Sequence, residues 1–197
     1  MLGLPETTEI SRPLPKKTLF AKFEMKPSQR DHFDEDISRM AIVNAVSPTT
    51  MPALQKGEEI ECIYVIEVLL KRKAYDPKNI LLLSKLIPQK ILFAMKFVDE
   101  IQIALYHTKL ITSPWQKENE AYIRLQGLNL DRVWKNLVAE IGNIIVEDGN
   151  TLEQQIAIDE EKARRIKTIA DLERKARAEK QPRKRLELFE EIKKLKA

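Results

Sequence analysis

The segment that decides the fold is Ile60-Glu-Cys-Ile-Tyr-Val-Ile-Glu-Val-Leu-Leu70, the strongest predicted strand of the chain. One of its faces consists of Cys62, Tyr64, Ile66, Val68 and Leu70. Because the other face is also largely apolar, we expect both sides of this strand to be covered. Downstream, Asp76-Pro77 is typical of a helix N-cap followed by proline at the first helical position, and a further apolar strand begins at Ile91. The region therefore predicts a strand–helix–strand unit.

Upstream of this unit, the sequence predicts a helix over residues 28–39 and a strand over residues 40–46. Ser28 and Asp31 have the spacing of a capping box, with Asp in the place of the usual Glu. The prolines near the N-terminus hold the backbone extended and remove amide donors. We therefore interpret residues 1–27 as an extended or wrapping segment, in which residues 17–23 are a candidate short helix.

Downstream of the unit, residues 91–97 and 101–107 are expected to pair as a hairpin, and residues 122–125 to add another strand. Asn129 is a candidate cap of the next helix, which is expected to end at Gly142. Apolar residues recur along this helix at helical spacing, so one face should dock on the sheet. That face consists of Leu130, Val133, Trp134, Leu137, Val138 and Ile141.

Together, these elements predict an α+β core domain over residues 28–146, with helices packed on a small, mostly antiparallel sheet. Residues 147–197 are expected to form a C-terminal helical arm. Pro182 would cost about 3 kcal/mol inside a helix, so a break near Gln181 predicts two helices that form a helical hairpin or coiled-coil arm. Its apolar positions are the candidate partner-binding residues. They are Leu152, Ile156, Ile166 and Leu172 on the first helix, facing Leu186, Phe189, Ile192 and Leu195 on the second.

The arm also accounts for the charge of the chain. The chain of 197 residues has 34 Lys and Arg against 30 Asp and Glu, a net charge of +4, and residues 151–197 alone hold 14 basic against 10 acidic side chains. Basic side chains near the expected break are the candidate nucleic-acid-binding set, because they could contact phosphates. They are Arg174, Lys175, Arg177, Lys180, Arg183, Lys184 and Arg185. The alternative is a solvated helix surface, since Glu173 and Glu179 interrupt the cluster.

A search for catalytic and metal-binding patterns assigns no catalytic residue, metal ligand or cofactor. His32 and His107 lie on separate predicted elements, and Cys62 lies in an apolar strand, where a thiol has a raised pKa. The five glycines form no phosphate-binding loop. Glu67 and Lys71 leave a divergent metal-dependent nuclease as one alternative, although they are four residues apart and not at the spacing of two that brings both side chains to one metal-bound water.

We expect a cytoplasmic protein. The first residues, MLGLPETTEI, have neither the basic nor the apolar region of a signal peptide. Apolar runs such as Ile80 to Leu83 are far shorter than the roughly 18 residues that suggest a membrane span. The single cysteine excludes an intrachain disulfide.

Several blocks of sequence resemble a bacterial family known only as a domain of unknown function, number 4391 in its series. The blocks are Leu14-Pro15-Lys16-Lys17 with Phe20 and Phe23; Gln29-Arg30 through Asp36-Ile37; Ser47-Pro48-Thr49; Lys85-Leu86-Ile87-Pro88 leading into Ile91-Leu92-Phe93; and Glu179-Lys180-Gln181 with Arg183-Lys184 and Glu187-Leu188. They span nearly the whole chain. The sequence departs from the family pattern at Pro182, where an aromatic residue is expected, which affects the turn of the arm.

The resemblance implies that genes of this family lie near restriction-type or antiphage helicases and DNA methyltransferases. No catalytic residue is carried over from the family. We expect a non-catalytic accessory or adaptor subunit that docks a helicase or DNA methyltransferase through the helical arm. The alternatives are a nucleic-acid-binding module that uses the basic arm, a divergent metal-dependent nuclease, and self-association of the arm as a homo-oligomer.

Overall fold

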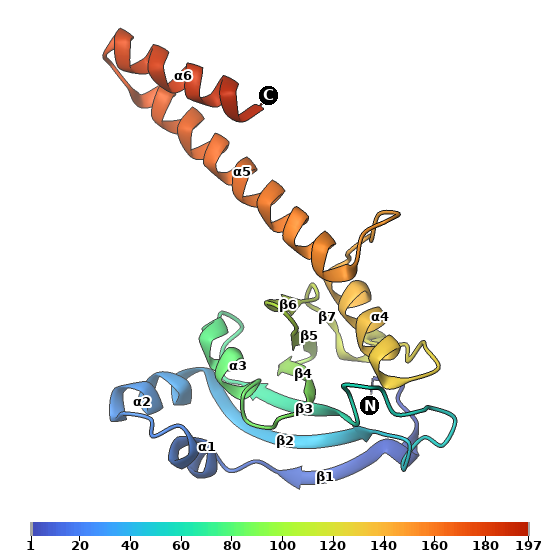
Figure 1. Cartoon of the computed structure of the whole chain (residues 1–197). Coiled ribbons are helices and arrows are strands. Elements are labelled where there is room, and N and C mark those ends of the chain that lie inside the picture. The colour runs from blue at the N-terminus through green and yellow to red at the C-terminus, as the bar shows by residue number, and fades with distance from the viewer. Residues whose placement is uncertain (1, 197) are drawn as a thin grey trace. The chain divides into compact units, whose positions relative to one another are not determined.

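The computed structural model describes residues 2–196, which divide into two compact units between Ile144 and Ile145. The first unit holds a mixed sheet with helices, and the second holds two helices (Figure 1). This architecture confirms the α+β class, the mostly antiparallel sheet and the C-terminal helical hairpin that the sequence predicts. None of the helices described is long and apolar enough to cross a membrane.

The first unit is built on a seven-stranded sheet with the order β1-β2-β3-β4-β5-β6, in which β7 also pairs with β5. The strands are β1 (Glu9–Pro13), β2 (Ile37–Val46), β3 (Ile63–Leu70), β4 (Lys90–Phe97), β5 (Glu100–Tyr106), β6 (Leu110–Thr112) and β7 (Gln116–Lys117). The helices are α1 (Lys16–Lys22), α2 (Pro27–Asp36), α3 (Pro77–Leu83) and α4 (Leu130–Gly142), with short 3-10 turns at Glu6–Thr8 and Glu118–Glu120. β3 and β4 are parallel and joined by α3, whereas the other pairs are antiparallel. The predicted strand–helix–strand unit is therefore confirmed.

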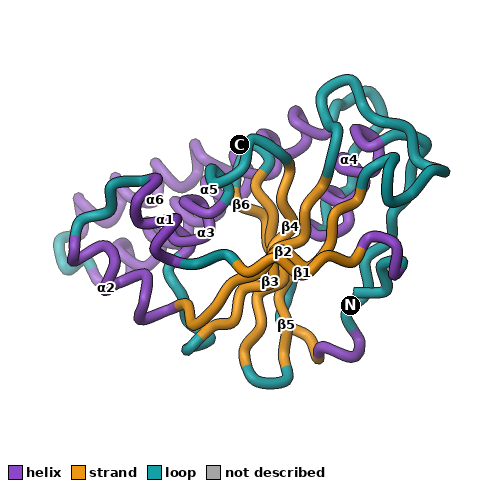
Figure 2. Tube along the Cα trace, turned by 90° about the horizontal axis from the view of Figure 1, so that it is seen from below, coloured by secondary structure: helices purple, strands orange, loops and turns teal. Residues whose placement is uncertain are grey.

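Helices α1, α2 and α3 cover one face of the sheet (Figure 2). Leu19, Phe33 and Ile80, one from each helix, are buried in a single cluster with Ile66 of β3 and Phe93 of β4. Because side chains alternate along a strand, Val65, Leu92 and Ala94 point to the opposite face, and they too are buried. The central strands are thus covered on both sides, as their composition predicts.

Helix α4 packs against β5 and β6 through its predicted apolar face, all of which is buried. Asn129 caps the helix as expected, because its Oδ1 accepts a hydrogen bond from the Arg132 N–H at 2.9 Å. At the other end, Asn143 and not Gly142 adopts the left-handed conformation of a helix C-cap, with φ of 48°. The helix ends at Gly142, as predicted, and Asn143 supplies the cap.

The N-terminal half differs from the prediction in where its elements begin. Residues 1–27 contain an edge strand, β1, and a helix, α1, whose Leu19 joins the core. α2 ends at Asp36 and β2 begins at Ile37, because Ile37 already pairs with Leu70 of β3. Lys26, whose N–H donates to Gln29 Oε1 at 2.9 Å, precedes α2, so the expected Ser28–Asp31 capping box does not form.

Two further strand predictions need correction. The central strand begins at Ile63, so Cys62 precedes it. Residues 122–125 form no strand, although Ile123 is buried and donates its N–H to the Leu2 carbonyl at 3.0 Å. Burial without a neighbouring strand explains why an apolar pattern there resembled a strand.

Asp76 caps α3 as predicted, since its Oδ1 accepts the Lys78 N–H at 2.8 Å. This hydrogen bond, opposed by partial burial and assisted by His32, lowers the pKa of Asp76. We expect Asp76→Ala to lower the free energy of unfolding by about 1 kcal/mol at neutral pH, as measured by urea unfolding. Asp76→Asn should keep most of the capping contribution, because its side-chain oxygen can still accept the hydrogen bond. Because the folded-state pKa is lowered, the contribution is present above the ordinary pKa of an aspartate and is lost as pH falls through the lowered value. Equal stability of wild type and Asp76→Ala at neutral pH would contradict this role.

Val98 occupies the turn between β4 and β5 with φ of 56°, which is a strained conformation for a β-branched residue. Its side chain is 83% exposed and so gains little from packing. We expect Val98→Gly to raise the free energy of unfolding by about 0.5–1 kcal/mol, because glycine adopts this φ without a steric penalty. Val98→Ala is the matched control, since it removes the branch but keeps a Cβ, and it should stabilise less. A destabilised Val98→Gly would show that the side chain contributes more than its exposure suggests.

The second unit consists of α5 (Leu152–Ala178) and α6 (Pro182–Lys196). Thr151 caps α5, because its hydroxyl accepts the Gln154 N–H at 3.2 Å and its own N–H donates to Gln154 Oε1 at 2.8 Å. Pro182 is the first residue of α6, where its missing N–H would have no helical partner in any case. The break predicted near Gln181 is therefore confirmed.

Candidate functional site

A small apolar seam holds the two helices of the second unit together. Leu172 and Ala176 of α5 and Ile192 of α6 are buried in it. The residues packed around them are Ile169, Leu188 and Leu195. At one end of the seam, Lys196 Nζ lies 2.8 Å from Glu173 Oε1, and this contact lowers the pKa of Glu173. The seam is what makes the two helices a hairpin.

The seam contains only three of the eight residues predicted to face one another, namely Leu172, Ile192 and Leu195. α6 has 15 residues and α5 has 27, so α6 can follow only the C-terminal part of α5 back from the break. Leu152 lies twenty positions before Leu172, about 30 Å along the helix axis, beyond the reach of α6. Leu152 and Ile156 are both buried, but outside this seam.

The other three predicted residues are exposed. Ile166 is 67% exposed, Leu186 is 61% exposed and Phe189 is 50% exposed. Leu186 and Phe189 lie three residues apart on α6, so their side chains are neighbours on its surface. We call these two residues the α6 strip. A buried residue such as Ile192 could contact a partner only if the hairpin opened, so the strip is the better candidate for partner binding.

We expect Ile192→Ala to destabilise the hairpin by about 2 kcal/mol, because it empties the centre of a seam with only three buried residues. The measurement is urea unfolding followed by far-UV circular dichroism, which reports the helices. Leu186→Ala is the matched control, since the same class of truncation at an exposed position should change the free energy of unfolding by less than about 0.5 kcal/mol. Equal effects of the two changes would contradict the seam.

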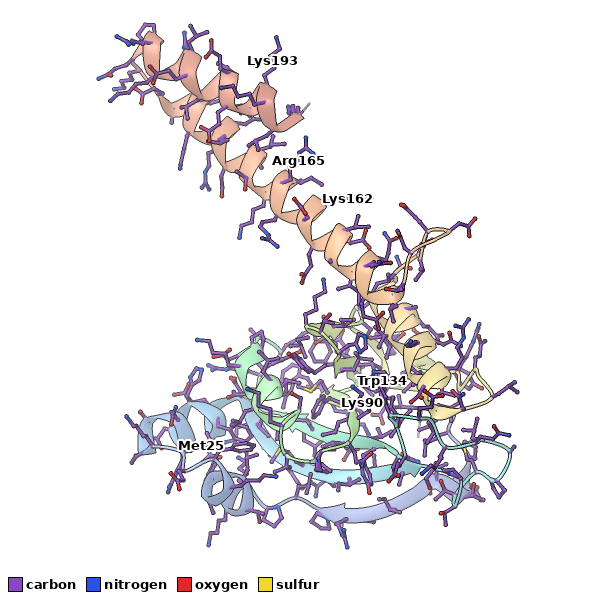
Figure 3. All side chains as sticks on the ribbon, viewed as in Figure 1. Met25, Lys90, Trp134, Lys162, Arg165 and Lys193 are labelled. Atoms are coloured by element: carbon purple, nitrogen blue, oxygen red, sulfur yellow. The ribbon has the colours of Figure 1, made fainter. Side chains whose placement is uncertain are left out.

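The seven basic residues of the predicted nucleic-acid-binding set are all exposed around the break between α5 and α6. Arg174 pairs with Asp171 at 3.0 Å and Arg183 pairs with Glu187 at 3.5 Å. Within residues 2–196, the remaining five make no direct ion pair. They are Lys175, Arg177, Lys180, Lys184 and Arg185. Figure 3 shows three further basic side chains of this unit, Lys162, Arg165 and Lys193. Of these, Lys162 pairs with Glu147 at 3.8 Å and Arg165 donates to the Leu195 carbonyl, so the basic side chains without a direct ion pair are mainly those near the break.

The first unit holds a fully buried carboxylate at Asp36, where α2 ends. Its Oδ1 accepts a hydrogen bond from Arg72 Nε at 2.5 Å. Its Oδ2 accepts the Asp76 N–H at 2.7 Å and the Asn79 amide at 2.8 Å. We call this set the Asp36 network. It joins α2, the end of β3 and α3, so it fixes the connection between the sheet and two of the helices that cover it.

Glu67 pairs with Lys96 and not with Lys71. In the parallel register of β3 and β4, Glu67 lies opposite Ala94, so Lys96 is its diagonal neighbour on the same face. Lys96 Nζ lies 2.7 Å from Glu67 and 2.6 Å from Glu118. Burial lowers the pKa of Lys96, but hydrogen bonds to the two carboxylates outweigh it and the net pKa is raised. Lys96 was not selected from the sequence; the available signal was a lysine near the end of an otherwise apolar strand.

The two histidines and the cysteine lie at separate places. His32 Nε2 is 3.1 Å from Asp76, and His107 Nδ1 accepts a hydrogen bond from Trp134 Nε1 at 3.3 Å. Burial raises the pKa of the Cys62 thiol, as predicted for an apolar environment, and a hydrogen bond with Tyr64 opposes it. Throughout the part of the chain that the structure describes, no three His, Cys, Asp or Glu side chains form a group that could hold a metal ion.

Comparison with known proteins gives one match. A family model described as a domain of unknown function (DUF4391) matches residues 2–197. No curated protein and no solved structure gives a significant match. The match covers both units, so the helical hairpin is part of the family's sequence pattern.

Proposed function

This chain belongs to the DUF4391 family, and from that premise we propose that it is a non-catalytic accessory subunit of a bacterial DNA restriction or antiphage system. In this proposal the chain docks a helicase or DNA methyltransferase through the hairpin of α5 and α6. The choice of partner rests on the genomic setting that the family resemblance implies. The choice of the hairpin rests on its surface.

The α6 strip is the observation that carries the proposal. Leu186 is 61% exposed and Phe189 is 50% exposed, although Ile192, three residues beyond Phe189, is buried. Two large apolar side chains one turn apart on an exposed helix match the anchors that a partner groove recognises. A residue at the centre of an interface can contribute more than about 1 kcal/mol to binding, and here Phe189 offers an aromatic anchor with Leu186 as apolar area beside it.

The polar groups of the first unit give no competing support for catalysis. Asp36, Glu67 and Lys96 each engage neighbouring side chains in ways that connect elements of the fold. Their hydrogen bonds and ion pairs account for the presence of these side chains at buried or half-buried positions. The proposal therefore assigns them a structural role.

The test is co-expression of the chain with the helicase or methyltransferase encoded beside its gene, followed by quantitative co-purification. We expect the double variant Leu186→Glu, Phe189→Glu to reduce recovery of the partner at least tenfold, because two charges would replace both anchors. Lys193→Glu with Lys194→Glu is the matched control, since it adds two acidic side chains to the same helix outside the strip. Recovery equal to wild type for the strip variant, with its helices intact by circular dichroism, would overturn the proposal.

The basic hairpin surface favours a second candidate function, a nucleic-acid-binding module. Lys180, Lys184 and Arg185 are exposed without a direct ion pair among the residues described, so they are free to contact phosphates. Binding of duplex DNA should then weaken steeply as salt rises. Arg177→Glu with Lys184→Glu should abolish this binding, whereas Lys162→Glu with Lys167→Glu, which makes the same change of charge elsewhere on α5, should retain most of it. Equal loss in both variants would indicate nonspecific attraction.

A further inference from the structure

The first unit contains an open groove of about 750 Å³ between β1, α1 and the connection from α3 to β4. Its walls come from the face of the sheet that α1–α3 cover. The apolar side chains that line it include Ile10, Leu14, Leu19, Met40, Ile42 and Ile87. The volume lies within the range of about 300–1,000 Å³ that is usual for small-molecule sites.

The charged residues that line the groove are both basic. Arg12 reaches it from β1 and Lys22 from α1, and no Asp or Glu is among the lining residues. Arg12 makes no hydrogen bond or ion pair with any of residues 2–196. The Lys22 ammonium donates a hydrogen bond to the Leu86 carbonyl on the opposite wall, which leaves two of its three N–H groups available. The groove thus combines an apolar body with a cationic rim.

Tyr64 adds a hydrogen-bond donor to this lining. The charge and hydrogen bonding of Cys62, together with burial, raise the pKa of Tyr64, while the Arg12 guanidinium acts in the opposite direction. The phenol is therefore protonated at neutral pH and can donate its O–H to an anion.

We propose that the groove binds a small amphipathic carboxylate, with an aliphatic body against the apolar walls and its anionic head at Arg12 and Lys22. Charge complementarity selects the ligand, because two cations without an acidic neighbour disfavour a cationic or neutral head. An arginine is suited to a carboxylate, since its planar fork can donate two parallel hydrogen bonds. The apolar walls exclude a highly charged ligand such as a free nucleotide.

An extended peptide fits the groove less well. β1 borders the groove as the edge strand of the sheet, but it is short, contains a bulge between Glu9 and Arg12, and ends in Pro13. Each of these features opposes the addition of another strand. A small molecule needs no backbone pairing, so the edge strand does not limit it. The proposal concerns the first unit alone and does not depend on the function proposed for the hairpin.

The test is isothermal titration of the full chain with decanoate, below the concentration at which micelles form. We expect saturable binding of one decanoate per chain and at least tenfold weaker binding of decyltrimethylammonium, which has the same chain and the opposite charge. Arg12→Gln with Lys22→Gln should weaken decanoate binding at least tenfold. Lys17→Gln with Lys26→Gln is the matched control, because both lysines are exposed and outside the groove, and it should bind like wild type.

A second variant tests the location independently of charge. Ala45→Leu adds bulk to the groove wall and should abolish decanoate binding while the chain remains folded by circular dichroism. Absence of decanoate binding to wild type, equal binding of the anionic and cationic detergents, or wild-type affinity in folded Ala45→Leu would each overturn the proposal. Binding of an acidic peptide in place of decanoate would also overturn it, in favour of a protein partner.

Discussion

Asp36→Ala is expected to lower the free energy of unfolding by about 3–5 kcal/mol, a large part of the 5–15 kcal/mol that stabilises a typical domain. The substitution removes the acceptor of three hydrogen bonds. The Asn79 amide would remain buried without that partner, which costs about 1–3 kcal/mol for an unsatisfied donor, and the Asp76 N–H would lose its acceptor as well. Arg72 is 46% exposed and can regain water, so its charge accounts for the smaller part of the loss.

Urea unfolding followed by circular dichroism measures this effect. Glu35→Ala is the matched control: it removes a neighbouring carboxylate that also contacts Arg72, at 3.4 Å, but that is 60% exposed. The control should change stability by less than about 0.5 kcal/mol. The loss of stability in Asp36→Asn should lie between those of Asp36→Ala and Glu35→Ala, because the asparagine amide would place its own N–H donor against one of the donors that the carboxylate accepts from. If Asp36→Ala and Glu35→Ala were equally mild, the Asp36 network would not be what connects α2, β3 and α3.

Trp134→Ala should also lower the free energy of unfolding by about 3–5 kcal/mol. The ring is 1% exposed at the centre of the buried face of α4. Its indole N–H donates to His107, and the Lys90 ammonium lies 5.7 Å from the ring centroid, so one side chain makes an apolar, a polar and a cation–π contact (Figure 3). Alanine would remove all three.

Trp134→Phe separates these contributions. Phenylalanine keeps most of the apolar area but cannot donate to His107, so we expect it to cost about 1–2 kcal/mol. Lys135→Ala, at the adjacent exposed position of α4, should be nearly neutral. Far-UV circular dichroism is the suitable measurement, because replacing one of only two tryptophans alters the fluorescence signal itself. If Trp134→Ala changed the free energy of unfolding only slightly, α4 would contribute little to the stability of the first unit.

The elements that could be predicted from the sequence are those whose evidence is local. The stripe from Leu130 to Ile141 repeats at helical spacing, and every member is buried. The signals at Asp76-Pro77 and Pro182 affect only the few residues next to them, so the start of α3 and the break before α6 were both predicted correctly. These signals need no knowledge of what lies across the fold.

The features that were missed depend on register between distant segments. β1 is a strand only because it pairs with β2, about thirty residues away in sequence, and its composition alone indicates an irregular tail. Lys96 meets Glu67 because β3 and β4 are parallel with one particular offset. Ile166 and Phe189 resembled seam residues because helical spacing predicts an apolar stripe along each helix. It does not predict which part of the stripe on one helix the other helix contacts. The Asp36 network was hidden for the same reason, since an acidic residue near a helix end is ordinarily exposed.

The middle of α5 is the part of this helix that we expect to open most readily. Every residue from Glu161 to Thr168 is exposed, whereas Leu152 and Ile156 near one end and Leu172 and Ala176 near the other are buried. Isolated helices fray from their ends, but here buried side chains lie near both ends of α5. Its centre is held by backbone hydrogen bonds and by exposed contacts, such as that of Arg165 with the Leu195 carbonyl and that of Lys162 with Glu147. Amide hydrogen exchange in α5 should therefore be fastest at its midpoint. A protease would cut there first and release a fragment in which the C-terminal part of α5 remains bound to α6.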